Sequence, residues 1–253
     1  MRTLEGHRTT ATKQMPILQA LWDKWIYRKT IAQYRDDGFG VIRNVCGLAT
    51  LNQLRFAYNE LLISAVGSHS YNLLGGAIPQ IWQPSLLHHT FKENEAIENG
   101  AARSALLMGV PRAAMCFDML IYKEPGNEVA TPWHQDHAYS EGGAAPKNLM
   151  PDPLSLVQMW IALDDVDAEN GCMHFISRYH LRPTLEHERA PEGGHMLRIK
   201  GVQTAIDVSA AIRCPLQAGD ATAHGPNTPH FTPGNRSRTR PRRAYIITFA
   251  PSA

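Results

Sequence analysis

The 253-residue sequence contains no apolar run close to the ~18–20 residues that a helix needs to span a bilayer, so we expect no membrane partner. Its N-terminus is polar and lacks the apolar segment of a secretory signal. The four cysteines lie far apart without a CxxC pair, which argues against a zinc knuckle or a disulfide framework. Together these absences favour a protein of the reducing cytoplasm.

The sequence also has little excess charge of either sign. Its 25 basic and 23 acidic residues leave a formal charge of +2, too small for binding nucleic acid through a broad basic face. The patterns GxxxxGK[ST], GxGxxG, GxSxG and HExxH are missing, which removes the signatures of P-loop, dinucleotide-binding, α/β-hydrolase and zincin proteins. Apolar residues make up 43% of the chain, which is enough for a folded core.

The first third of the chain has the pattern of helices. Helical spacing of apolar residues predicts helices over residues 15–37, 51–66 (capped by Thr50) and 96–108, with a short strand at residues 41–45. From about residue 113, short strands separated by loops rich in proline and glycine are predicted at residues 114–122, 156–163, 172–176, 196–199 and 244–249. We therefore predict one domain over residues 1–253, mainly β. A helical part (about 1–110) would pack on a sandwich or barrel (about 111–250).

The chain has 12 histidines, which invites a search for metal ligands. The segment Trp133-His134-Gln135-Asp136-His137 contains an HxD pair. In an extended segment, residues i and i+2 point to the same face, so His134 and Asp136 would stand side by side. An imidazole and a carboxylate are two thirds of a 2-His-1-carboxylate triad, which leaves positions open on Fe(II). A surface turn or a hydrogen bond would also explain an isolated pair.

A third ligand has to come from another segment. Residues 219–237 read GDATAHGPNTPHFTPGNRS and offer His224 and His230. A strand that begins after Asp220 and ends near His230 could return to the HxD pair. Arginines then crowd the chain at Arg236, Arg238, Arg240, Arg242 and Arg243. They suit a solvated loop, but a guanidinium at the start of the last strand could also clamp a carboxylate with two hydrogen bonds.

These segments together resemble the phytanoyl-CoA dioxygenase family of Fe(II)/2-oxoglutarate-dependent oxygenases. The resemblance covers roughly residues 38–250 and is concentrated in four blocks. They are DMLIYKEPG (118–126), TPWHQD (131–136), WIALDDVDAENGCM (160–173) and a distal block with His230, Asn235, Ser237 and PRRA (241–244). Their order and spacing are more specific than any single block. The resemblance implies a double-stranded β-helix, a jelly roll related to the cupins.

The resemblance implies three iron ligands, which are His134, Asp136 and His230. His230 is favoured over His224 because Asn235 follows it at the short distance typical of the family. Related halogenases replace the carboxylate with a small residue so that halide can bind iron. The presence of Asp136 therefore implies hydroxylation in preference to halogenation.

The resemblance also implies a site for 2-oxoglutarate. Arg242 would bind its distal carboxylate, with Arg243 as the alternative because the arginine spacing carries one apparent insertion. Further residues fall where the family contacts or shapes this site, namely Lys123, Trp160, Asn235 and Ser237. Trp160 could equally be a core aromatic, and Lys123 could be a lysine at a strand end that extends to solvent.

The implied reaction oxidises a small molecule with O2 and 2-oxoglutarate and releases succinate and CO2. Hydroxylation of a C–H bond comes first among the possible outcomes, and desaturation, epoxidation and ring formation stay open. A natural product or a polar metabolite is the expected substrate, ahead of an acyl-CoA. The expected substrate contacts flank the metal motif or close the other side of the pocket: Gln135, His137, Tyr139 and Trp82. Residues 140–153 are a candidate lid.

Two other functions remain open from the sequence. The chain could be a non-catalytic jelly roll that binds a metal or a ligand, although all three expected metal ligands are present. It could also be a zinc-dependent hydrolase that uses the same ligands with water, although no obvious general base lies beside them. Dependence on 2-oxoglutarate separates these hypotheses. The sequence does not indicate an oligomeric state.

Overall fold

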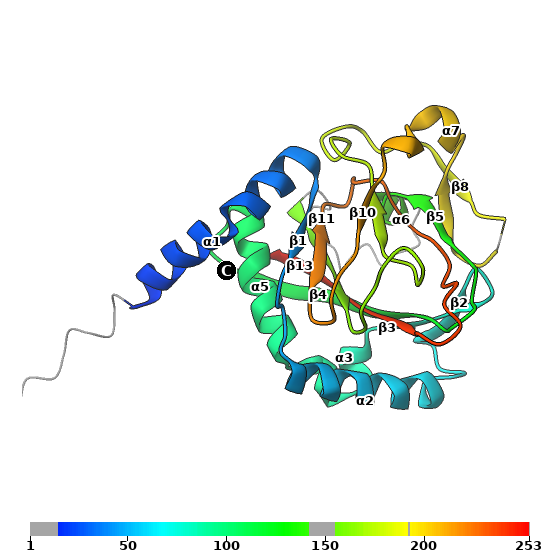
Figure 1. Ribbon diagram of the computed structural model, residues 1–253, viewed down its shortest axis with the longest axis horizontal. Helices are drawn as coiled ribbons and strands as arrows, with labels where there is room; N and C mark the ends of the chain where they lie inside the picture. The colour runs from blue at the N-terminus through cyan, green and yellow to red at the C-terminus, as the bar shows by residue number, and fades with distance from the viewer. Residues whose placement is uncertain (1–14, 142–154, 192, 253) are drawn as a thin grey trace, which may run out of the picture.

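Two antiparallel sheets face each other at the centre of the computed structural model, which describes residues 15–141, 155–191 and 193–252 (Figure 1). The larger sheet has seven strands, in the order β1 (Phe39–Ile42), β11 (Ala221–His224), β6 (Val157–Ala162), β13 (Arg242–Pro251), β4 (Ala113–Lys123), β3 (Ile78–Trp82) and β2 (Tyr71–Leu74). The smaller sheet has four, in the order β10 (Ile212–Cys214), β7 (Met173–Phe175), β12 (His230–Thr232) and β5 (Thr131–His134). This is the mainly β jelly roll that the sequence predicted.

The remaining elements surround this sandwich. A separate hairpin pairs β8 (His187–Arg189) with β9 (Leu197–Ile199). The helices are α1 (Met15–Asp37), α2 (Leu48–Ser64), α3 (Pro84–Leu87), α4 (His89–Lys92), α5 (Glu95–Met108), α6 (His137–Glu141) and α7 (Val202–Ala205), with a 3₁₀ turn at Val208–Ala210. In the part of the chain that the structure describes, none of these helices combines the length and apolar character needed to cross a membrane.

The long helices form where the apolar spacing predicted them, but α2 begins earlier than expected. Its N-cap is Gly47, which offers no side chain, and the predicted cap Thr50 lies inside the first turn. The hydroxyl of Thr50 instead donates to Glu95 Oε2 at 2.9 Å. Glu95 also accepts the N–H of Gly47, so one carboxylate joins the start of α2 to the start of α5.

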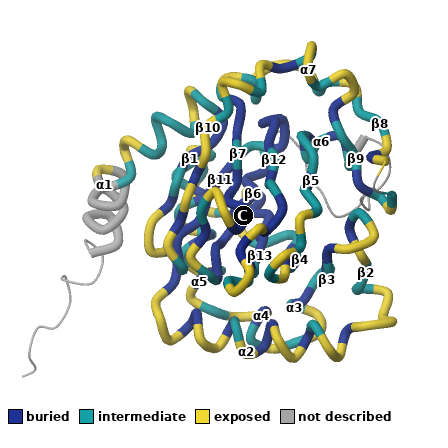
Figure 2. Tube along the Cα trace, turned by 45° about the vertical axis from the view of Figure 1, so that its right-hand side comes forward, coloured by how far each residue is buried: buried dark blue, intermediate teal, exposed yellow. Residues whose placement is uncertain are grey.

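The molecule has two main apolar clusters, one on each face of the larger sheet. The first packs α2 and α5 against the outer face through residues such as Leu54, Tyr58 and Phe249, all buried. The second lies between the two sheets and includes Trp160 and Phe175. Figure 2 shows buried segments concentrated in the strands and exposed positions along α2 and α7. The candidate site lies beside the second cluster, inside the sandwich.

The segment after Asp220 differs from the single strand that the sequence predicted. It forms two strands, β11 in the larger sheet and β12 in the smaller one, joined by a turn over residues 225–229. Pro226 and Pro229 lack the N–H that a continuous ladder needs, which explains the break. The crossing brings both candidate histidines of this segment to the interior, because His224 ends β11 and His230 begins β12.

Candidate metal and co-substrate site

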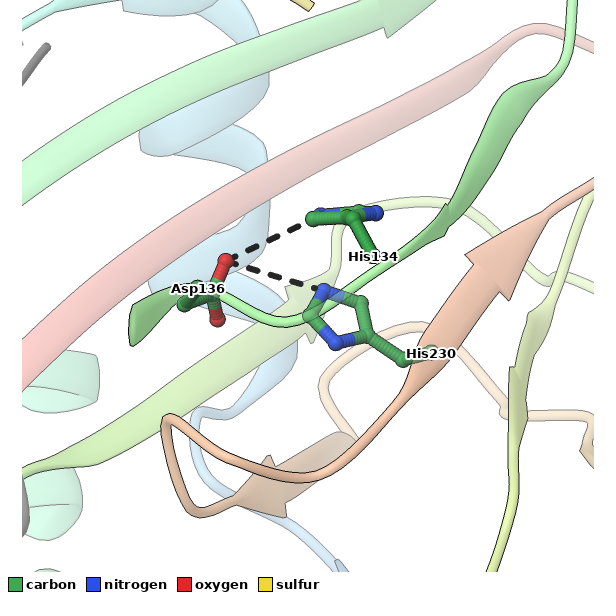
Figure 3. A group of neighbouring side chains, drawn as sticks. All are labelled: His134, Asp136 and His230. Atoms are coloured by element: carbon green, nitrogen blue, oxygen red, sulfur yellow. Dashed lines mark ion pairs between the residues drawn. The ribbon is translucent and has the colours of Figure 1, made fainter. Parts of the chain in front are cut away.

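Three side chains meet between the two sheets (Figure 3). His134 ends β5 and His230 begins β12, and strand register pairs the two residues directly. Asp136 follows two residues after the strand, and its Oδ1 lies 3.7 Å from Nε2 of each histidine. The three ligand atoms lie within 4.8 Å of one another. Each carboxylate–imidazole separation of 3.7 Å is short enough for one ion with metal–ligand bonds of about 2.0–2.2 Å to bind both atoms of the pair.

Both histidines are oriented by backbone carbonyls. Nδ1 of His134 lies 2.7 Å from the Pro132 carbonyl, and Nδ1 of His230 lies 3.0 Å from the Thr228 carbonyl. A nitrogen that faces a carbonyl oxygen carries the proton, so Nε2 of each ring keeps its lone pair for a metal. Burial lowers the pKa of His134, and it lowers the pKa of His230 well below the ordinary value. Both rings are therefore in the neutral form that binds metal.

His224 contacts the same carboxylate from the other side. Its Nε2 lies 3.1 Å from Asp136 Oδ2, the oxygen that is not shared between His134 and His230. Nδ1 of His224 is buried and has no hydrogen-bond partner among the described residues. Burial alone would raise the pKa of Asp136, but the surrounding histidines favour the ionised carboxylate, with a hydrogen bond from His224, and that pKa lies below its ordinary value. The carboxylate is therefore ionised.

A cavity of about 60 Å³ extends from these side chains to Arg242 at the start of β13. The guanidinium is 1% exposed and stands over the ring of Trp160, with its carbon 5.4 Å from the ring centroid. Its Nε and Nη2 have no hydrogen-bond partner among the described residues. Burial lowers the pKa of Arg242 to about 10, so the group is still charged at neutral pH. A buried cation with free donors suits a bound carboxylate.

Arg243, the alternative clamp, points elsewhere. Its Nε and Nη2 bind the two oxygens of Asp164 at 3.0 and 2.7 Å, a paired arrangement outside the cavity. Of the two neighbouring arginines, Arg242 alone lines the cavity and has donors free for a ligand.

Lys123, Asn235 and Ser237 hold the turn that precedes Arg242 and do not line the cavity. Nζ of Lys123 donates to the Pro233 carbonyl at 2.8 Å and to Thr232, and burial lowers its pKa well below the ordinary value. Asn235 Nδ2 donates to the carbonyl of Lys123 at 3.1 Å, and its Oδ1 accepts the N–H of Ser237 at 3.0 Å. These residues therefore support the turn that places Arg242 at the cavity without lining the cavity themselves.

Two of the expected substrate contacts are engaged away from the cavity. Gln135 is fully buried, and its side-chain amide donates to the Asn227 carbonyl at 2.6 Å and accepts the Leu185 N–H at 2.8 Å. His137 Nδ1 lies 2.8 Å from the hydroxyl of Thr184. Both side chains therefore join the segment that follows β5 to neighbouring loops through hydrogen bonds.

The other two expected substrate contacts flank the site. The ring of Tyr139 meets His134 edge-on, with 5.8 Å between ring centroids. Trp82 is partly exposed and meets His195 edge-on at 5.3 Å. Of the candidate lid, residues 140 and 141 end α6, and the rest lies outside the described residues.

Several residues of the cavity wall were not expected from the sequence. They lie on regular strands, and although four of them fall inside the blocks that resemble the family, no block singled them out: Met119, Ile121, Thr131, Gln158, Met173, Thr232 and Ile246. The available signal was alternation along a strand, since residues 119 and 121, like 158 and 160, share one face. That signal identifies a buried face but does not tell a cavity from a packed core.

Comparison with known proteins assigns a family. The family model described as phytanoyl-CoA dioxygenase (PhyH) matches residues 34–244. The peroxisomal phytanoyl-CoA dioxygenase of Bos taurus is 24% identical over 221 residues, which make up 81% of this chain and 63% of that protein. This chain therefore spans less than two thirds of the length of that relative.

Two solved structures share the fold. EvdO2 from Micromonospora carbonacea var. aurantiaca, complexed with 2-oxoglutarate, is 24% identical, with a TM-score of 0.71 over 88% of this chain and 90% of that one. The epimerase SnoN, in complex with Fe3+, alpha ketoglutarate and nogalamycin RO, is 22% identical, with a TM-score of 0.71 over 90% of this chain and 85% of that one.

Proposed function

Because the chain belongs to the phytanoyl-CoA dioxygenase family, we propose that it is an Fe(II)- and 2-oxoglutarate-dependent oxygenase that acts on a small molecule. One observation carries this proposal. A single cavity holds a carboxylate with two imidazoles at one end and, at the other, a guanidinium with two nitrogens that have no partner among the described residues. The first set suits a metal and the second suits the far carboxylate of a dicarboxylate co-substrate.

The residues of the cavity fit both groups. His134 and His230 present neutral nitrogens and Asp136 presents an ionised oxygen, the ligand set of iron sites with three open positions. Arg242 offers a carboxylate two donors that no residue of the described chain occupies. Iron bound there would reduce O2 with electrons released by decarboxylation of 2-oxoglutarate, which gives succinate and CO2.

The protein's own contribution is positioning and the exclusion of water. The carbonyls behind His134 and His230 orient each ring so that its Nε2 could hold a metal, and His224 holds the second oxygen of Asp136, so that Oδ1 is left for the metal. Between the ligands and Arg242 the wall is largely apolar, formed by Met119, Ile121, Trp160, Met173 and Ile246. A dry wall strengthens the electrostatic interaction of Arg242 with a carboxylate and keeps water from the open positions.

Within this function, hydroxylation of a C–H bond in a natural product or polar metabolite is the proposed reaction. It is supported by Asp136, which occupies the position that halogenases leave to halide. Desaturation, epoxidation and ring formation are the alternatives, because the same oxidant serves them. We place the protein in the cytoplasm, in keeping with its four free thiols.

A single-turnover experiment tests the oxygenase function. The protein is loaded anaerobically with Fe(II) and 2-oxoglutarate, exposed to O2, and assayed for succinate by mass spectrometry. We expect succinate in an amount that follows the loaded iron, and only the background of free Fe(II) with Asp136→Ala. Equal succinate from the wild type and Asp136→Ala would rule out the oxygenase. If the protein instead hydrolysed a substrate when loaded with zinc, in the absence of 2-oxoglutarate, the result would support the alternative function of a zinc-dependent hydrolase.

A further inference from the structure

The wall of the metal cavity continues beyond β4 onto the next strand. Met119 and Ile121 of β4 line the cavity. Strand register pairs Trp82 of β3 with Met119, and Gln80 with Ile121. Cross-strand partners point to the same face of a sheet, so Trp82 and Gln80 extend the cavity side by one strand. Ile81 between them faces the opposite way, into the core beneath the helices.

His195 joins this extension from a distant part of the chain. Its Nε2 lies 3.0 Å from Oε1 of Gln80, and its ring meets Trp82 edge-on with 5.3 Å between centroids. Gln80 is 5% exposed, whereas Trp82 and His195 are each partly exposed. The buried amide therefore holds His195, which in turn contacts Trp82, and both rings remain partly exposed.

The same segment reaches the metal ligands. Two residues after His195, the N–H of Leu197 donates to the hydroxyl of Tyr139 at 3.0 Å. The ring of Tyr139 lies edge-on to the ligand His134. A continuous set of contacts thus runs from the candidate metal centre to Trp82, and we call Gln80, Trp82, Met119, Ile121, Tyr139 and His195 the β3 wall.

The hydrogen bonds of Gln80 fix the proton on His195. The side-chain nitrogen of Gln80 lies 3.3 Å from the sulfur of Met119. A thioether accepts hydrogen bonds but has no proton to donate, so the amide nitrogen faces Met119 and the amide oxygen faces His195. Nε2 of His195 must then carry the proton. Burial lowers the pKa of His195, so the ring is neutral and Nδ1 keeps a lone pair. No described residue is bonded to that Nδ1.

From these contacts we infer that Trp82 and His195 bind the non-reacting part of the substrate, and that this part is an uncharged ring bearing hydroxyl groups. The inference rests on the proposed oxygenase function. Trp82 supplies an apolar surface for one face of such a ring, and Nδ1 of His195 accepts a hydrogen bond from a hydroxyl. The side chains of the β3 wall carry no charge. The cation that acts on His195, Arg189, is exposed and donates to the Gly194 carbonyl, so the wall itself favours a neutral ligand over a phosphate or carboxylate.

Ligand-detected NMR tests the inference with defined probes. Protein loaded anaerobically with Fe(II) and 2-oxoglutarate is titrated with neutral phenyl hexopyranosides, with their fully O-methylated ethers, and with palmitoyl-CoA. We expect a phenyl hexopyranoside to bind, and its methyl ether to bind about fivefold more weakly because it lacks hydroxyl donors. Trp82→Ala should abolish saturation transfer, whereas Trp25→Ala, at a tryptophan 59% exposed on α1, should not.

Two substitutions at His195 separate its two nitrogens. His195→Gln keeps an amide near the position of Nε2 and should weaken hexopyranoside binding about fivefold, the loss of one hydrogen bond. His195→Asn places its amide oxygen near the position of Nδ1 and should restore most of that binding. Failure of every hexopyranoside to bind, binding indifferent to Trp82→Ala and His195→Gln, or tighter binding of palmitoyl-CoA through the same residues would each overturn the inference.

The visible absorption of the Fe(II)–2-oxoglutarate complex is recorded on each sample. It distinguishes failure of the proposed oxygenase function from failure of the inference about the β3 wall. If the wild type shows no such absorption, the proposed function itself fails. If the absorption is normal in the wild type, Trp82→Ala and His195→Gln while hexopyranoside binding is absent or unchanged by the substitutions, the oxygenase stands and the inference about the β3 wall is wrong.

Discussion

Arg242 and Arg243 are neighbours in sequence, yet their surroundings are opposite. Arg243 binds both oxygens of Asp164, whereas Arg242 is buried against Trp160 with two nitrogens unpartnered among the described residues. We therefore expect Arg242→Met to weaken 2-oxoglutarate binding about 100-fold, the loss of a bidentate, charge-assisted pair worth about 3 kcal/mol. Anaerobic calorimetry with Fe(II) present measures it. Arg243→Met is the matched control and should leave the affinity for 2-oxoglutarate unchanged. Weaker binding in Arg243→Met and unchanged binding in Arg242→Met would show that Arg243 binds the co-substrate.

His224 tests how the carboxylate is held. Its Nε2 binds Asp136 Oδ2, so His224→Phe frees that oxygen and leaves the carboxylate to rotate. We expect Fe(II) to bind about 10–100-fold more weakly, the usual effect of losing a partner that orients a metal ligand. Competition with a chelator measures the affinity.

Thr222→Val is the control for this substitution, because Thr222 lies on the same strand with a buried hydroxyl that has no partner among the described residues. It should bind iron as the wild type does. Wild-type affinity in His224→Phe would show that His224 only fills space.

Single residues also mark the limit of the sequence analysis. The HxD pair and the distal histidine were predictable because each lies in a short motif with characteristic spacing. Gln135 was expected to face substrate because it lies between two candidate metal ligands, but alternation along the segment turns its side chain to the backbone of Leu185 and Asn227. Which loop packs behind a motif depends on distant residues, and the motif carries no information about them.

At the scale of elements, the turn between β12 and β13 positions Arg242. Gly234 packs directly on the backbone of Glu128, so a methyl group at this position would overlap an atom that cannot move aside. Gly234→Ala should reduce the free energy of unfolding by about 1–3 kcal/mol, the usual cost of overpacking, as measured by urea denaturation. Gly225→Ala is the control, because a methyl group there meets only ordinary contacts. Equal stability of the two variants would contradict this account of the turn.

Elements with strong periodicity were predictable, and elements fixed by the neighbouring sheet were not. The long helices and β4, β6 and β13 follow from apolar spacing, within a few residues at each end. The hairpin of β2 and β3 was missed, although the pair Gly75-Gly76 between the strands is a turn signal in the sequence. Both glycines have positive φ in the structure. Prolines divide the segment after Asp220 into β11 and β12, and only the two sheets together determine where each part pairs.

At the scale of the whole molecule, stability should depend on the buried carboxyl of Asp118, which is 1% exposed beneath α3. Burial raises its pKa from 3.8 to about 6, against hydrogen bonds from Ser85 and Tyr245 that lower it. Since the folded pKa is the higher one, its contribution to stability is complete below about pH 4 and is lost as pH rises through 6. Relative to Asp118→Asn, the wild type should lose up to about 3 kcal/mol of unfolding free energy between pH 4 and 7.

Urea denaturation at a series of pH values measures this difference. Asp165→Asn, at an exposed aspartate, is the control and should follow the wild type across the range. A constant difference between the wild type and Asp118→Asn from pH 4 to 7 would show that Asp118 does not titrate as its burial requires.

The jelly roll was predictable from the order of four sequence blocks and is confirmed. That the whole chain forms a single domain stays a prediction. The β3 wall was out of reach of the sequence. It depends on contact between Gln80 and His195, 115 residues apart, and neither residue belongs to a motif. Contacts of this kind arise when a distant hairpin packs on a strand that carries no motif.

The central claim is that one cavity holds Fe(II) and 2-oxoglutarate together, and an anaerobic absorbance titration tests it most directly. We predict a weak visible charge-transfer band that appears only when both are added, is absent in Asp136→Ala, and needs more 2-oxoglutarate in Arg242→Ala. A folded wild-type protein that shows no band at saturating Fe(II) and 2-oxoglutarate would contradict the account.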